Sequence, residues 1–124
     1  VDIIDPDELI KVWTVSDLHV YLTANYICSW SLLNAMSCST PCLVSDTEPV
    51  REFVTENKNG WHCKFPDVDD LVRKAGEIIK MPREKLADHG RIARERVVRD
   101  YSLSRTVDSY EALFNELKSG STSP

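Results

Sequence analysis

The stretch that decides the fold is SWSLLNAMSCSTPCLVSD, residues 29–46. It predicts a short helix followed by a buried strand, with Pro41 between them because proline cannot continue a helix. Leu32 and Met36 define the inner face of this helix, and Asn34 lies nearly opposite them on a helical wheel. Asn34 therefore faces either solvent or a ligand, and the helical periodicity leaves both interpretations open.

Upstream of this stretch the sequence predicts one helix and one strand. Asp5 and Pro6 are typical of a helix start, the aspartate as N-cap and the proline at the first helical position. The run LHVYLT, residues 18–23, is a compact β-rich segment suited to a central strand. A loop of residues 24–28 then leads into the helix that carries Asn34.

Downstream, a short helix opens at Pro49, and WHCKF, residues 61–65, predicts a third strand. Helices then follow from Asp67, over about Arg83–Asp100, and from Ser102, each with helical spacing of its apolar residues. The last helix is expected to turn an apolar stripe inward, formed by Val107, Tyr110, Leu113, Phe114 and Leu117.

Strands that alternate with helices indicate right-handed crossovers and a parallel sheet. We therefore predict an α/β fold: a partial Rossmann-like domain with a short parallel sheet of about three strands, covered by helices and ending in three consecutive helices. Residues 119–124 are small and polar and predict a flexible tail. So few strands leave an edge of the sheet open, through which we expect a homo-oligomer to form.

The composition argues against several classes of partner. The net charge of −5 argues against a nucleic-acid surface or an anionic membrane surface. No apolar run approaches the roughly 18 residues of a membrane span. The four cysteines have no standard metal-ligand spacing, so we expect reduced thiols, no bound metal and a cytoplasmic protein. Among the histidines, His19 is expected to be buried and His62 and His89 to lie at the surface.

The ordered run SDLHVYLT, SWSLLNAMSCSTPCLVSDTEPVREFV and NGWHCKF, followed by DYS, resembles the C-terminal part of retaining GT-B glycosyltransferases, also described as glycosyl transferases group 1 or family 4-like. The likeness covers roughly residues 8–115. The matching positions are Ser16-Asp17, Leu32-Leu33, Ala35-Met36, Cys38, Pro41, Ser45-Asp46, Pro49, Glu52, Asn59-Gly60 and Asp70-Leu71.

The resemblance implies that residues 1–118 are the C-terminal portion of a domain that binds a nucleotide-sugar donor. The whole enzyme would transfer a hexose with retention, without a metal or other cofactor, and an acceptor-binding domain would precede this portion. The portion carries no catalytic residue by this resemblance and is expected to be inactive alone. The implied donor-binding residues are Tyr26, Ile27, Cys28, Ser29, Trp30, Leu33 and Asn34.

Three positions depart from the family pattern. Tyr26 and Asn34 stand where the family has two glutamates eight positions apart, and Ser39 stands where it has a glycine. An asparagine can accept one hydrogen bond from a ribose and donate another, but it lacks the charge-assisted bonds of a carboxylate. The departures leave an alternative, a non-catalytic degenerate transferase module used for packing or partner binding. An unrelated flavodoxin-like binding domain would explain none of the matched residues.

Overall fold

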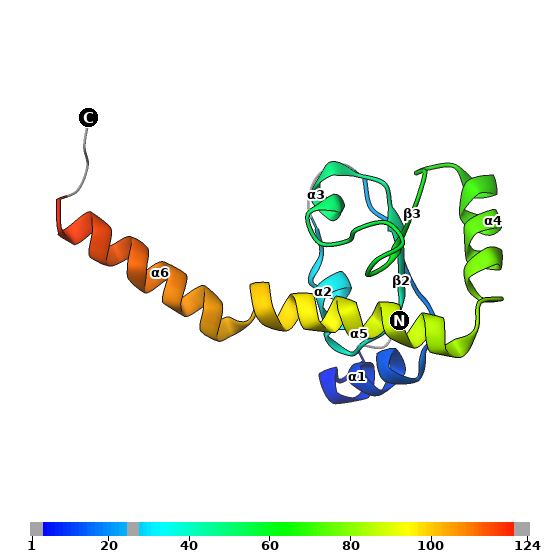
Figure 1. The fold of residues 1–124 in the computed structure, drawn as a ribbon, viewed down its shortest axis with the longest axis horizontal. Coiled ribbons are helices and arrows are strands. Elements are labelled where there is room, and N and C mark those ends of the chain that lie inside the picture. Colours follow the sequence, from blue (N-terminus) through cyan, green and yellow to red (C-terminus); the bar gives the residue numbers. More distant parts are fainter. Residues whose placement is uncertain (1–3, 25–27, 121–124) are drawn as a thin grey trace.

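The structure is a computed structural model, and it describes residues 4–24 and 28–120. Its three strands form one parallel sheet in the order β1-β2-β3, and three consecutive helices follow β3 (Figure 1). The predicted α/β class with a short parallel sheet is confirmed. The elements are α1 (Pro6–Val15), β1 (His19–Tyr21), α2 (Trp30–Ser37), β2 (Cys42–Ser45), α3 (Glu48–Arg51), β3 (Trp61–Cys63), α4 (Val68–Ile78), α5 (Arg83–Asp100) and α6 (Leu103–Lys118).

The helix starts lie where the sequence predicts them because side chains cap the first turns. Asp5 and Asp67 each accept a hydrogen bond from a backbone N–H, at 2.9 Å in α1 and 3.0 Å in α4. Ser102 accepts a longer bond of 3.4 Å at the start of α6. Such caps satisfy N–H groups that a helix cannot pair internally.

Strand β2 is the centre of the sheet, and all four of its side chains are completely buried. Cys42 and Val44 face a cluster formed with α1, α2 and α5, whereas Leu43 faces a second cluster formed with α4. Helix α5 joins the two, because its Leu86 packs in the second cluster and its Ala93 in the first. Burial also raises the pKa of the Cys42 thiol to about 12, so this thiol stays protonated.

The two outer strands end the sheet in different ways. Strand β1, whose apolar composition suited a central position, lies at an edge instead, and Val20 and Leu22 are each 42% exposed. The His19 N–H donates to the Pro41 carbonyl oxygen at 2.8 Å, on the side of the strand that faces β2. Because backbone groups alternate in direction along a strand, the N–H and C=O of Val20 point to the opposite side, the open edge. This is the open edge that the small number of strands predicts.

The outer edge of β3, in contrast, is capped by charged side chains. The Glu56 carboxylate accepts the His62 N–H at 2.6 Å, and the Lys74 ammonium donates to the His62 carbonyl. Beyond the strand, Asp70 Oδ2 accepts the Lys64 N–H at 2.8 Å. These side chains take the place of a neighbouring strand and leave β1 as the edge that can be extended.

The turn between α2 and β2 is fixed by its own hydrogen bonds and by a close helix crossing. The N–H groups of Ser39 and Thr40 bond to Met36 O and Ala35 O, both at 3.0 Å, in the Schellman pattern that ends helices. Ser39 accordingly has a φ of 60°, a conformation that favours glycine. Gly90 of α5 crosses so closely that an added Cβ would lie 1.9 Å from the Ser39 carbonyl oxygen.

The expected inner stripe of the last helix is wrong. None of the residues of α6 is buried, and its apolar side chains are all exposed. Figure 1 shows the reason: α6 extends away from the sheet beyond the end of α5, so no layer of the described chain covers it.

Among the described helices, none is long and apolar enough to cross a membrane.

His62 and His89 are buried rather than at the surface, with 9% and 7% of their surface exposed. The Nδ1 atom of His62 lies 2.9 Å from Glu56 Oε2, and the His89 ring stacks on Trp61 with ring centroids 4.2 Å apart. Each contact joins the histidine to a residue from another segment of the chain. Exposure was expected because histidine is polar, but these packing contacts bury both side chains.

The crossing at Gly90 predicts opposite effects for two glycine substitutions. Gly90→Ala places a methyl group against a backbone oxygen, so the free energy of unfolding should fall by about 1–3 kcal/mol or more. Gly76→Ala in α4 is the control, since an added Cβ there meets no atom within 4 Å and should stabilise the helix by up to about 1 kcal/mol. Urea unfolding measures both. Equal effects of the two variants would contradict the close crossing.

The environment of His19 predicts a pH dependence of stability. Its ring lies between those of Trp13 and Tyr21, and burial lowers its pKa below the ordinary value. The unfolded chain then binds the proton more readily, so the stabilising contribution is complete above about pH 6.5 and is lost as the pH falls below it. His19→Phe keeps a ring and removes the titration. Urea unfolding across this range should show a shallower fall for the variant, and identical slopes would contradict the assignment.

Candidate functional site

Helix α2 begins just beyond the carboxyl end of β1, the edge at which open α/β sheets bind their ligands. The Ser29 N–H donates to the Tyr21 hydroxyl at 2.7 Å, and the Ser29 hydroxyl accepts the Ser31 N–H at 3.2 Å. In the described part of the chain, the Trp30 N–H at the first helical position has no hydrogen-bond partner. This end of α2 thus carries a backbone donor and the positive end of the helix dipole.

The predicted donor-binding residues divide by environment. Tyr26 and Ile27 lie outside the described residues. Cys28 and Leu33 are half-buried against the main core cluster, and burial raises the pKa of the Cys28 thiol. Trp30 is 78% exposed beside the helix start. Packing against the core explains Cys28 and Leu33 without a ligand.

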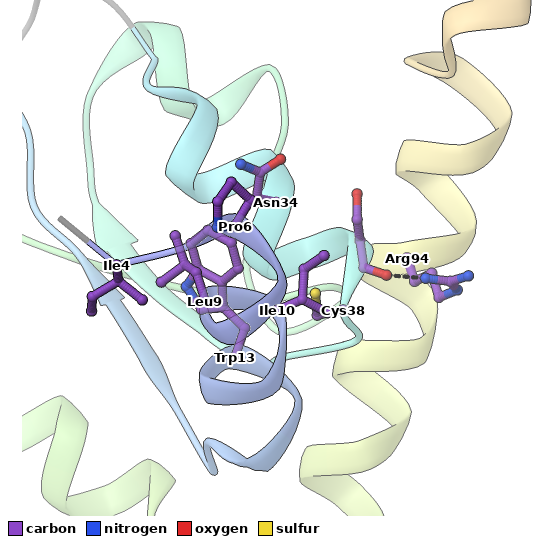
Figure 2. Close-up of a pocket in the computed structure, with 9 residues that line it drawn as sticks. Ile4, Pro6, Leu9, Ile10, Trp13, Asn34, Cys38 and Arg94 are labelled. Atoms are coloured by element: carbon purple, nitrogen blue, oxygen red, sulfur yellow. Dashed lines mark hydrogen bonds between the residues drawn. The ribbon is translucent and has the colours of Figure 1, made fainter.

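Asn34 lies on the outward side of α2, exposed, while Leu32 and Met36 are completely buried. The helical wheel predicts this orientation. Asn34 borders a pocket of about 530 Å³ between α1, α2 and α5 (Figure 2). The pocket is lined by Ile4, Pro6, Leu9, Ile10, Trp13, Asn34, Ser37, Cys38 and Arg94.

Most of the pocket wall is apolar and comes from α1, with polar groups contributed by α2 and α5. Arg94 Nη1 donates to the Ser37 carbonyl and so holds its guanidinium beside the end of α2. The Asn34 amide supplies one donor and one acceptor group beside the apolar wall. A ligand with a flat apolar part and hydroxyl groups matches this arrangement.

Sequence reasoning did not find the contribution of α1 and α5 to this pocket. The sequence signal that could have found it is the set of apolar residues Leu9, Ile10 and Trp13 in α1. In the structure Trp13 is buried, but Ile10 is 49% exposed at the pocket. Arg94 gave no signal of its own, because its place beside α2 depends on how α5 crosses the sheet.

Among the described residues, no group of three or more His, Cys, Asp or Glu side chains is placed to hold a metal ion. The four cysteines are free thiols.

Comparisons with known proteins agree with the resemblance read from the sequence. The sequence model described as "Glycosyl transferases group 1" matches residues 4–96. A curated relative, N-acetyl-alpha-D-glucosaminyl L-malate synthase of Bacillus anthracis, is 24% identical over 111 residues, which are 90% of this chain and 29% of the relative.

Solved structures show the same fold. Sucrose-phosphate synthase of Thermosynechococcus elongatus superposes with a TM-score of 0.83 at 20% identity, over 98% of this chain and 30% of that one. HepE of Anabaena in complex with UDP-glucose superposes with a TM-score of 0.74 at 17% identity, over 85% of this chain and 29% of that one. The chain therefore spans less than a third of the length of these relatives. Because the family match extends over most of its residues, the chain belongs to the glycosyl transferases group 1 family.

Proposed function

We propose that this chain forms part of the donor site of a glycosyltransferase and binds a nucleotide-sugar at the start of α2 and in the adjoining pocket. The complete enzyme would transfer a hexose with retention. The observation that carries the proposal is the position of Asn34, which borders an apolar pocket. It lies on a helix whose first N–H has no hydrogen-bond partner among the described residues. The structural neighbour HepE, which has the same fold, was solved with UDP-glucose.

The spacing along α2 suits the parts of a nucleotide. The amino end of the helix, with the Trp30 N–H, favours the diphosphate because anions bind at helix N-termini. Asn34 lies four residues further on, about 6 Å along the axis at 1.5 Å per residue, where it can bond to a ribose hydroxyl. The apolar side chains of Leu9 and Ile10 then provide a surface for the base.

The asparagine weakens this site relative to a glutamate. A carboxylate accepts charge-assisted hydrogen bonds from both ribose hydroxyls, whereas the amide of Asn34 accepts bonds only at its oxygen and without the charge. We expect modest affinity for the donor as a result. The side chain at position 34 is an amide and not a carboxylate, so it cannot supply the charge-assisted bonds.

The remaining partners of the proposal lie outside this chain. We propose that an acceptor-binding domain completes the enzyme, so that the chain alone does not turn over substrate. The open edge of β1, with Val20 and Leu22 exposed, supports association with further chain or with a second copy.

If a second copy binds at this edge, the chain forms a homo-oligomer. Sedimentation at high concentration measures this self-association, and a monomer would contradict the homo-oligomer.

Restoring a carboxylate tests the donor site directly. Asn34→Glu should bind UDP-glucose about fivefold more tightly than the original chain, since a charged hydrogen bond exceeds a neutral one by about 1 kcal/mol. Asn34→Ala should bind it more weakly. Asn115→Glu, the same substitution on exposed α6, is the matched control and should leave the affinity unchanged. Isothermal titration calorimetry measures all four proteins.

The outcomes separate the proposal from its alternative. Tighter binding by Asn34→Glu together with an unchanged control supports a donor site that the asparagine has weakened. No binding by any of the proteins at millimolar donor supports the non-catalytic module, in which Asn34 is a surface residue. Equal changes in Asn34→Glu and Asn115→Glu would mean that only net charge matters.

A further inference from the structure

A second pocket, of about 540 Å³, lies at the carboxyl ends of β2 and β3. It shares none of the residues of the pocket beside Asn34. Its wall is formed almost entirely by charged and polar side chains. They are Asp46, Arg51, Glu56, His62, Cys63, Lys64, Asp70, Arg73 and Lys74.

Two of the three carboxylates in this charged pocket are already engaged. Asp46 Oδ1 accepts a bond from Arg51 Nε at 2.7 Å, and this bond lowers the pKa of the Asp46 carboxyl. Asp70 accepts the Lys64 N–H with one oxygen and Arg73 with the other, which lowers its pKa as well. Both carboxyl groups therefore stay ionised, and each is hydrogen-bonded to the partners just named.

The third carboxylate belongs to the capped edge of β3. Glu56 Oε2 accepts both the backbone N–H and Nδ1 of His62, at 2.6 and 2.9 Å. Lys74 donates to the His62 carbonyl and lies 3.8 Å from Glu56 Oε1. Each of the three carboxylates thus has at least one oxygen that accepts a hydrogen bond within the described chain.

The cations, in contrast, keep donors to spare. Within the described chain, the terminal nitrogens of Arg51 and the Lys64 ammonium have no hydrogen-bond or ion-pair partner. Separately, the Nε2 atom of His62 is buried and has no hydrogen-bond partner among the described residues, although buried polar atoms nearly always have one. It is not counted among these donors, because Nδ1 is the ring nitrogen that faces the Glu56 carboxylate. Four Lys and Arg side chains against three carboxylates also leave the pocket with a positive balance.

We propose that this charged pocket binds a phosphate group. Guanidinium and ammonium groups are the preferred partners of phosphate oxygens. Here they lie together at the carboxyl ends of the strands, where open α/β sheets bind their ligands. The group can be free phosphate or the phosphate of a sugar, since both present the same oxygens. The proposal is independent of the donor site, because the two pockets share no residue.

Amide NMR at constant ionic strength tests this with two ligands, inorganic phosphate and glucose 6-phosphate. Both should produce saturable shifts at residues 46, 51, 62–64 and 70–74 at millimolar concentration if the phosphate group alone is recognised. Shifts from glucose 6-phosphate only would identify a sugar phosphate as the ligand. Neither result depends on shifts near residues 28–34, which report the donor site.

Paired variants make the test specific. Arg51→Gln/Lys64→Gln should weaken binding by at least about tenfold, because it removes two charged donors. Lys64→Gln alone keeps the Arg51–Asp46 pair and should show a smaller loss. Lys80→Gln/Arg105→Gln removes the same charge at exposed positions outside the pocket and should bind as the original chain does. Absence of saturable shifts, or equal affinities for both double variants, would overturn the proposal.

Discussion

The complete burial of β2 is the constraint on which the rest of this structure depends. A strand covered on both faces needs a layer of helices on each side, and α5 contributes to both by crossing from the α4 side to the α2 side. That crossing requires close approach of two backbones, with Gly90 directly against the carbonyl of Ser39. The turn at Ser39 is therefore held from outside by α5 and from inside by the hydrogen bonds that end α2.

The same arrangement fixes where ligands can bind. Helix α2 is locked at its carboxyl end by the turn and at its amino end by the contact of Ser29 with Tyr21, so Asn34 has a defined place beside α1. Among the described residues, charged side chains bond to the outer edge of β3, whereas no strand pairs with the outer edge of β1. Both the open edge and the exposed α6 agree with a unit that spans less than a third of the length of its relatives.

Local sequence patterns predicted most of the elements because caps and periodicity act within a few residues. The starts of α1, α4 and α6 follow from Asp5, Asp67 and Ser102, and the outward position of Asn34 follows from the helical repeat. What failed depends on distant contacts. The burial of His89 comes from a Trp61 that lies 28 residues earlier in the chain (89 minus 61).

The candidate site was predicted in the same uneven way. The start of α2 could be located from its strand–loop–helix pattern, which places backbone donors at the carboxyl edge of a parallel sheet. The apolar wall from α1 and the position of Arg94 could not, because they depend on how separate helices pack. The charged pocket has residues from the β2–α3 connection, the edge of β3 and α4, and no single segment signals it.

The most direct measurement is a crystal structure of this chain grown with UDP-glucose. We expect the diphosphate at the amino end of α2 and a ribose hydroxyl within hydrogen-bond distance of the Asn34 amide. A nucleotide seated elsewhere, or an Asn34 side chain that contacts only solvent beside a bound donor, would contradict it.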